Sequence, residues 1–385
     1  MRTILILALL APLAAAGEHD GANAPARRWT HPRGPASRSC ISSAHAIESL
    51  GDVVWTYKSK APISVTPLTW DGTGYLRAGG DLIAIDLETG KRVASQNVGA
   101  TSAIALGEGA VFLVHGTQLK QWRRSSSAFR NRWTFDVGAG AGAPCIEGKE
   151  IYITGGGKLM RLRSGAEKPV WSKGAKCYGD PALMGEEIYA LETDGDGKAA
   201  LVCRARLDGS EKARVVLGAS GKTGMVALNR EQACVRIDKR WVMVRRAAKD
   251  GKITLDKPWS IDLTAEPLLY SRAVIGIGGK DGALMLYRIT KKKNIRQPMV
   301  KAAERQDLLK GAGLPMSMQS VFSCGLWTGD INANRIRWHL HERPDRRLFD
   351  KGVGLRPVPA DNERLLIVSA DRKRIICIKP EVIGS

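Results

Sequence analysis

Short hydrophobic runs alternate with polar turns over most of the chain. The turns are rich in Gly, Asp, Asn and Lys, and helical periodicity can be traced only across Val300–Leu309. The runs include Leu82–Ile85, Ala110–Val114, Glu150–Ile153, Glu187–Leu191, Trp241–Val244, Val274–Ile277 and Leu365–Val368. Many short strands separated by regular turn signals predict an all-β protein, which could be a sandwich, a barrel or a propeller.

The spacing of tryptophans distinguishes these architectures. Trp55, Trp133, Trp171 and Trp259 each close a block of the sequence, and an alignment of the blocks places Ala94 where another tryptophan would stand. The first four of these positions are 39, 39 and 38 residues apart, and 88 residues separate Trp171 from Trp259. A period of about 40 residues with about four strands per unit is typical of propeller blades.

Block starts fall near residues 61, 101, 141, 179, 223, 265, 316 and 356, which predicts an eight-bladed β-propeller, with seven blades as the alternative because residues 300–350 are irregular. The last block holds only about three strands. Asp52–Lys58 carries a block-closing Trp but precedes any complete block. We therefore expect the ring to be closed by N- and C-terminal strands that share a blade, and we expect Trp55, Trp133, Trp171 and Trp259 to dock one blade against the next.

One repeat resembles a known family. Asp81–Ser95, DLIAIDLETGKRVAS, is similar to the repeat of quinoprotein-type, or PQQ-like, propellers: a strand that ends Ala-x-Asp, a Thr-Gly-Lys turn and an outer strand that ends in Trp. Here Ala94 replaces the Trp, and other blocks keep the Trp but lose the Asp and Gly-Lys. The resemblance extends loosely over about residues 47–380. The family includes quinone-dependent alcohol dehydrogenases and, closest in kind, a non-catalytic scaffold of the outer-membrane β-barrel assembly machinery, so the fold leaves the function open.

The N-terminal residues predict export. Arg2, the apolar run Ile4–Ala16 and the alanines at its end indicate a signal peptide over residues 1–16 that is too short to be a comfortable membrane span. Residues 17–46 lack periodicity and predict a flexible linker, which leaves 47–385 for the propeller. We expect a monomeric mature protein in the periplasm or outside the cell, without an integral membrane segment.

The charge predicts attraction to anions. The net charge is +21, with 59 basic and 38 acidic residues, and basic residues cluster in places, including Arg123–Arg124. The candidate anion contacts are Lys291, Lys292, Lys293, Arg335 and Arg337, with a solvated surface as the equal alternative. Few aromatic residues accompany these charges, and export separates the chain from intracellular nucleic acid, so a protein or an anionic polymer is the expected partner.

Motifs that could carry chemistry are incomplete. The chain has no adjacent cysteine pair of the kind that lies under the quinone in quinoprotein dehydrogenases, so we expect no cofactor. GASGKTG (218–224) lacks the first glycine of a P-loop, and ETDGDG (192–197) lacks the closing acidic ligand of a calcium loop; both are interpreted as loops or turns. His339 and His341 share a strand face but have no identifiable third ligand, so no metal site is predicted.

The cysteines and carboxylates complete the prediction. Seven cysteines follow the signal peptide, and Cys203, Cys234 and Cys377 stand in apolar runs that predict burial. No catalytic triad can be assembled, and no catalytic residue is assigned. The sequence favours a non-enzymatic binding or scaffold propeller; the alternative is a propeller enzyme that acts on a glycan or an alcohol through carboxylates in the central channel.

Overall fold

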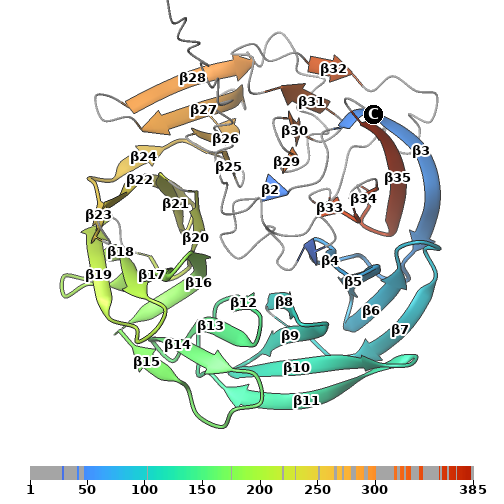
Figure 1. Ribbon diagram of the computed structural model, residues 1–385, viewed down its shortest axis with the longest axis horizontal. Coiled ribbons are helices and arrows are strands. Elements are labelled where there is room, and N and C mark those ends of the chain that lie inside the picture. Colours follow the sequence, from blue (N-terminus) through green and yellow to red (C-terminus); the bar gives the residue numbers. More distant parts are fainter. Residues whose placement is uncertain are drawn as a thin grey trace, which may run out of the picture.

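The computed structural model describes backbone and side chains for residues 52–263, except 102, 175, 219–220, 230 and 248–251, and for parts of 267–296 and 355–379; beyond these it bounds strands only. The described part is all-β and contains no helix, as the alternation of short apolar runs predicted. The sheets follow one another around a common centre in the order of the sequence (Figure 1). The architecture is that of a β-propeller.

The first three sheets are antiparallel and take their strands in chain order from the centre outward. The first consists of β1 (Arg28–Trp29), β4 (Leu68–Trp70), β5 (Thr73–Ala78), β6 (Asp81–Asp86) and β7 (Arg92–Asn97). The second consists of β8 (Ala103–Gly107), β9 (Ala110–His115), β10 (Gln118–Ser125) and β11 (Ala128–Asp136). The third consists of β12 (Cys145–Glu147), β13 (Glu150–Gly155), β14 (Lys158–Arg163) and β15 (Trp171–Lys173).

A nine-stranded sheet follows. It contains β16 (Cys177–Met184), β17 (Glu187–Thr193), β18 (Ala199–Ala205), β19 (Glu211–Val216), β20 (Gly224–Leu228), β21 (Gln232–Ile237), β22 (Arg240–Lys249), β23 (Lys252–Leu255) and β24 (Trp259–Ile261). Its two antiparallel halves, β16–β19 and β20–β24, are joined by a parallel pairing of Asp180 with Met225. Each half repeats the strand order of the preceding sheets.

Three more sheets complete the chain. They are β25 (Leu268–Tyr270), β26 (Ala273–Gly278), β27 (Ala283–Ile289) and β28 (Asn294–Val300); then β2 (Ile41–Ser42), β29 (Met316–Met318), β30 (Val321–Cys324), β31 (Trp327–Asp330) and β32 (Trp338–Leu340); and finally β3 (Ile47–Lys58), β33 (Val358–Pro359), β34 (Leu365–Val368) and β35 (Arg374–Val382). The short strands β1 and β2 fall within the segment interpreted as a linker, and the trace of helical periodicity at 300–309 lies outside the described residues.

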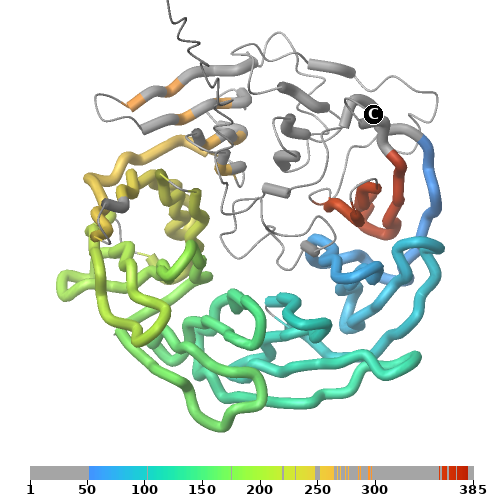
Figure 2. The backbone as a smooth tube through the Cα atoms, viewed as in Figure 1, coloured from blue at the N-terminus to red at the C-terminus, as the bar shows by residue number. Residues whose placement is uncertain are grey.

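The last sheet joins the two ends of the propeller sequence. β3 pairs antiparallel with β35, so that Asp52 lies opposite Lys379 and Lys58 lies opposite Arg374. In Figure 2 the blue N-terminal strand runs beside the red C-terminal strand. The strand that carries Trp55 thus belongs to the sheet of the last block.

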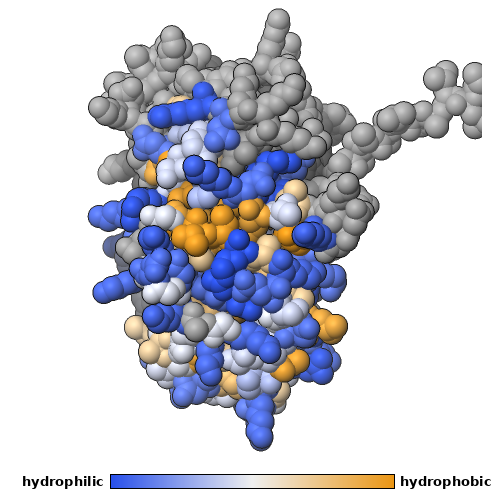
Figure 3. Space-filling model, turned by 90° about the vertical axis from the view of Figure 1, so that its left-hand side faces the viewer, coloured by the Kyte–Doolittle hydropathy of each residue, from blue (hydrophilic) through white to orange (hydrophobic). Residues whose placement is uncertain are grey.

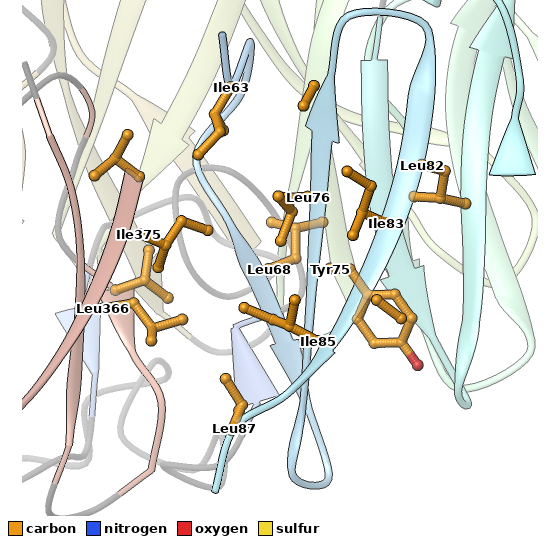
Figure 4. Packing of buried hydrophobic residues seen from close by; sticks show 14 of the residues in the cluster. Ile63, Leu68, Tyr75, Leu76, Leu82, Ile83, Ile85, Leu87, Leu366 and Ile375 are labelled. Atoms are coloured by element: carbon orange, nitrogen blue, oxygen red, sulfur yellow. The ribbon is translucent and has the colours of Figure 1, made fainter. Parts of the chain in front are cut away.

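Hydrophobic side chains between neighbouring sheets hold the sheets together. Figure 4 shows this packing where Leu366 and Ile375 of the last sheet face Leu68 and Leu76 of the first sheet and Ile63, which precedes that sheet. All five side chains are completely buried. Because each sheet alone would expose apolar residues on both faces, stacking the sheets is what removes this area from water.

Candidate protein-docking site

Three of the predicted docking tryptophans reach the next sheet through a hydrogen bond. The indole Nε1 atoms of Trp55, Trp133 and Trp171 donate to backbone carbonyl oxygens of Leu87, Ala166 and Arg206 at 2.9, 3.0 and 3.0 Å. Each acceptor lies in the turn between the last two strands of the following sheet, or of the β16–β19 half for Arg206. The tryptophan therefore satisfies its polar atom while its ring covers the turn.

Glycine is required where such a ring meets the turn. Gly90 has a φ of +69°, and a Cβ atom there would lie 2.5 Å from the ring of Trp55. Gly209 has a φ of +73°, and its Cβ would lie 3.0 Å from the ring of Trp171. Trp259 makes a different contact: its ring packs edge-on against Tyr287 of the following sheet, with the centroids 5.7 Å apart.

The turn between β18 and β19, residues 206–210, is fixed by contacts from the β12–β15 sheet. Besides the bond from Trp171, the guanidinium of Arg161 donates to the carbonyl oxygens of Arg206 and Leu207 at 3.2 and 2.9 Å. The guanidinium of Arg206 donates to the hydroxyl of Tyr152 at 3.1 Å and forms an ion pair with Glu147. We call residues 206–210 the Leu207 turn.

Contacts within its own sheet complete the support of the Leu207 turn. Arg204 donates to the carbonyl oxygen of Gly209 at 3.2 Å. Asp208 accepts hydrogen bonds from the amide and hydroxyl of Ser210, and these bonds hold the pKa of Asp208 below its usual range. Leu207 is nevertheless 78% exposed at the tip of the turn. A large apolar side chain is thus presented to solvent on a rigid support.

A second exposed apolar side chain stands just before β15 of the neighbouring sheet. Val170 is 47% exposed, and its amide donates to the carbonyl oxygen of Arg161, the same residue whose guanidinium holds the carbonyl of Leu207. Exposed single hydrophobic residues are common, so what distinguishes Leu207 is the number of hydrogen bonds that fix the turn beneath it. Sequence analysis missed Leu207; its signal was a large apolar residue inside the polar turn Arg-Leu-Asp-Gly-Ser.

Buried charges are paired within the β16–β19 sheet. The carboxylate of Glu192 is almost completely buried and accepts from Arg204 at 2.7 Å and from Arg214 at 2.5 Å. The thiol of Cys177 also lies 3.5 Å from a Glu192 oxygen, and burial together with this carboxylate raises the pKa of Cys177 to about 12. The thiol is therefore protonated at neutral pH, and unlike a reactive cysteine it has little thiolate character.

The other described cysteines are buried as well. Cys145, Cys203, Cys234 and Cys377 are free, buried thiols within strands. The apolar runs predicted the burial of Cys203, Cys234 and Cys377. Burial raises the pKa of Cys203 to about 11 and that of Cys377 to about 12. These thiols contribute to packing between sheets.

The two incomplete motifs lie in turns. Asp194 accepts from the amides of Asp196 and Lys198, which closes the turn between β17 and β18. In the P-loop-like segment, the carboxylate of Asp238 accepts from the amides of Lys222 and Thr223 at 3.2 and 3.1 Å. These two amides are thus bonded to a carboxylate of the protein itself.

The candidate anion contacts at Lys291, Lys292, Lys293, Arg335 and Arg337 lie outside the described residues, as does the side chain of His341. The described residues contain no group of three His, Cys, Asp or Glu side chains that could hold a metal ion. They also contain no helix long and apolar enough to cross a membrane.

Comparisons with known proteins agree with the fold. The family model described as outer membrane protein assembly factor BamB matches residues 42–212. BamB from Moraxella catarrhalis is 14% identical, with 86% of this chain and 99% of that chain covered and a TM-score of 0.55. The quinohemoprotein alcohol dehydrogenase ADHIIG from Pseudomonas putida HK5 is 10% identical, with 94% and 82% covered and a TM-score of 0.61. A search of curated proteins found no significant match.

A europium-containing methanol dehydrogenase is also similar, at 11% identity, with 92% of this chain and 90% of that chain covered and a TM-score of 0.54. The chain is therefore a PQQ-like β-propeller. Within that class it resembles BamB. Because the identities are low, these structures establish the fold alone.

The described residues do not fit the quinone that the dehydrogenase relatives suggest. Quinoprotein dehydrogenases place the cofactor on a pair of adjacent cysteines, and this sequence has no such pair. The five described cysteines are instead distributed over five separate strands, β12, β16, β18, β21 and β35, and all are buried. We therefore derive no chemistry from a quinone.

Proposed function

We propose that the chain is a non-enzymatic scaffold outside the cytoplasm that docks a protein partner through the Leu207 turn. The observation that carries the proposal is the exposed Leu207 on a turn fixed by Trp171, Arg161 and Arg204. A rigid apolar contact loses little conformational entropy on binding, so most of the free energy gained by burying it contributes to affinity. The resemblance to an assembly factor supports a protein partner.

The proposal includes the architecture that presents this turn. We propose eight blades, with β16–β19 and β20–β24 as two of them, closed into a ring by the pairing of β3 with β35. We further propose that residues 1–16 are removed as a signal peptide and that 47–385 form one domain of a monomeric protein. In that domain, each blade docks against the next through one of the tryptophans Trp55, Trp133, Trp171 and Trp259. A closed ring holds its loops in fixed relative positions, which suits a scaffold.

Three ionisable groups of the described blades have shifted pKa values that support a binding role over a catalytic one. Hydrogen bonds from Arg161 and Arg163 outweigh burial and keep the pKa of Glu150 below its usual range. Burial raises the pKa of Cys177 and Cys203 to about 12 and 11. A general acid or base works best with a pKa near the operating pH. These groups hold one charge state and serve the packing between blades.

A docking experiment tests the proposal. A photo-crosslinking amino acid at position 207 should capture a discrete protein partner in the native envelope, whereas the same amino acid at Val216, which is 42% exposed on β19, should not. With the captured partner purified, Leu207→Asp should weaken its affinity by about tenfold or more, because burying a leucine contributes about 1.5–3 kcal/mol.

Val216→Asp is the matched control, since it places the same carboxylate on another exposed apolar position. It should leave affinity unchanged, and both variants should keep the thermal midpoint of the parent. Equal affinity of Leu207→Asp and the parent would exclude the Leu207 turn as the docking site. Retention of stoichiometric pyrroloquinoline quinone with calcium, and alcohol oxidation, would instead favour an enzyme.

A further inference from the structure

Four exposed arginines lie on one β-hairpin, formed by β10 and β11. They are Arg123 and Arg124 on β10 and Arg130 and Arg132 on β11, and we call this element the arginine hairpin. Arg123 lies directly opposite Arg130 in the register of the two strands. Arg132 is the extra residue of the bulge, because Gln121 pairs with Trp133 and Trp122 pairs with Asn131.

The positive charge of the arginine hairpin is not balanced. Among the residues that the structure describes, no carboxylate forms an ion pair with any of the four arginines. Two like charges placed directly opposite each other on neighbouring strands destabilise a sheet. The arrangement therefore costs stability in the free protein, and a ligand that brings negative charge would remove that cost.

Charged residues can protect an exposed strand edge without carrying an excess of positive charge. β19 is also an outer strand with charged residues, but its charges are paired: Lys212 lies 3.5 Å from Glu187, and Arg214 contacts Glu192 and Glu211. Charges guard an edge whether or not they are neutralised within the protein. The free arginines of β11 thus indicate recognition.

The geometry of β11 indicates the kind of ligand. β11 spans nine residues and has a hydrogen-bonded neighbour, β10, on one side only among the strands of the structure. Its outer edge offers backbone donors and acceptors that a peptide strand can pair with. Arginine suits such a ligand because its planar guanidinium binds a carboxylate through two parallel hydrogen bonds.

The direction of the side chains favours a peptide over a flat anionic surface. Neighbouring residues of a strand point to opposite faces, so Arg124 points to the face opposite that of Arg123 and Arg130. The face of Arg124 is turned toward the β4–β7 sheet, because Phe129, its cross-strand partner, is buried against Tyr75. A plane cannot contact both faces of the hairpin at once, whereas an extended chain along its edge lies between them.

We propose that the arginine hairpin binds an extended acidic peptide segment of a partner protein, which adds as a strand to the outer edge of β11. The carboxylates of that segment would pair with Arg123, Arg130 and Arg132, and one on its opposite face would pair with Arg124. This inference rests on the proposed role in protein binding but uses a surface different from the Leu207 turn. The two sites can therefore fail or hold independently.

Fluorescence anisotropy with a labelled peptide of alternating Glu and Thr tests the proposal in low-salt buffer. The parent protein should bind it, and a peptide of alternating Gln and Thr should bind at least about tenfold more weakly, because charge-assisted bonds are lost. Arg123→Glu with Arg130→Glu should abolish binding. The control, Lys252→Glu with Lys257→Glu, makes the same change in net charge at exposed positions of β23 and the loop after it, and should bind like the parent.

Further arms separate the alternatives. A Glu–Thr peptide with N-methylated threonines should lose binding, because strand addition needs its amide donors. Binding that survives N-methylation, or that is stronger for heparin or for phosphatidylglycerol vesicles with the same dependence on Arg123 and Arg130, would overturn strand addition. Absence of binding by the parent would overturn the whole inference. If the charge reversal impairs folding, Arg123→Gln with Arg130→Gln provides the same comparison, and Leu207→Asp should bind the peptide normally.

Discussion

Two hairpins of this propeller each bury an apolar side chain against the strands that precede their own group of strands, but their arginines differ. The β22–β23 hairpin buries Ile253 in a core shared with the β16–β19 strands, and the β10–β11 hairpin buries Phe129 against Tyr75 of the first sheet. Arg246 of the first hairpin is buried and paired, whereas Arg123 and Arg130 of the second are exposed and face each other. The apolar anchor is structural in both, and only the charges differ.

The paired arginine belongs to a buried network. Arg246 contacts Glu187 at 3.1 Å, donates to the hydroxyl of Tyr189, and has its guanidinium 5.7 Å from the centroid of the Tyr189 ring. Lys212 also reaches Glu187. The side of the molecule that carries β19 and β22–β24 is seen in Figure 3, where hydrophobic residues gather among hydrophilic ones. On this side of the molecule Arg246 connects β22 to β17. Arg123 and Arg130 of the arginine hairpin make no such contact among the described residues, which leaves them available for a partner.

The largest expected effect is on the paired side of this comparison. Arg246→Met should destabilise the protein by roughly 3 kcal/mol, because it removes a buried guanidinium and leaves the largely covered carboxylate of Glu187 with only Lys212 as a partner. Arg123→Met should change stability by less than about 0.5 kcal/mol, as is usual for an exposed side chain. Urea unfolding followed by tryptophan fluorescence measures both. Similar losses in the two variants would mean that the hairpins do not differ as described.

A second expected effect depends on alkaline pH. Cys203 lies beside Tyr189 near the β22–β23 contact, and burial raises the pKa of Cys203 to about 11 and also raises that of Tyr189. The pKa of a cysteine in the unfolded chain is about 8.5, so above that pH the unfolded chain loses a proton from the thiol that the folded chain keeps. The stability is complete below this pH and falls as the pH rises toward the folded value, by about 1.4 kcal/mol per pH unit for each such group.

Unfolding free energies measured between neutral and alkaline pH check this effect. Cys203→Val should flatten the decline by removing one titrating group, while Arg123→Met should retain the slope of the parent. A variant without Cys203 that loses stability as steeply as the parent would show that the thiol is not protected. The effect would then lie with Tyr189 or with other groups.

The sequence predicted repeated features better than single contacts. The repeat places Trp133 and Trp171 at block ends, and the indole of each donates to a carbonyl oxygen in a turn of the following sheet. The block pattern also predicts that the strand with Trp55 pairs with the last block, and β3 pairs with β35. The sequence does not distinguish Leu207 from other apolar residues in turns, because its exposure depends on how Arg161 and Arg204 fix the turn from elsewhere in the fold. The sequence contains the pair Arg123–Arg124, but Arg123 lies opposite Arg130 only because the two strands are joined by the two-residue turn Ser126–Ser127, and no local pattern predicts that turn.

The smallest expected effect is the sharpest test of the comparison, since its sign is opposite to that of most substitutions. Arg130→Glu would place a carboxylate directly opposite Arg123, replacing a like-charge pair by an opposite-charge pair on the same strand positions. Such cross-strand pairs contribute roughly 0.2–1 kcal/mol, so the variant should be slightly more stable than the parent, and the gain should shrink in high salt. Thermal midpoints at low and high salt measure the gain in stability and its dependence on salt. Arg130→Gln serves as the control, because it removes the repulsion without adding an attraction, and its stability should fall between those of the parent and Arg130→Glu.

The same Arg130→Glu variant should bind the Glu–Thr peptide less tightly than the parent. A gain in stability together with a loss of binding would mean that the exposed arginines are kept at a cost to the fold because a partner needs them; a loss of stability would mean that Arg130 makes a structural contact comparable to that of Arg246, and the difference between the two hairpins would disappear.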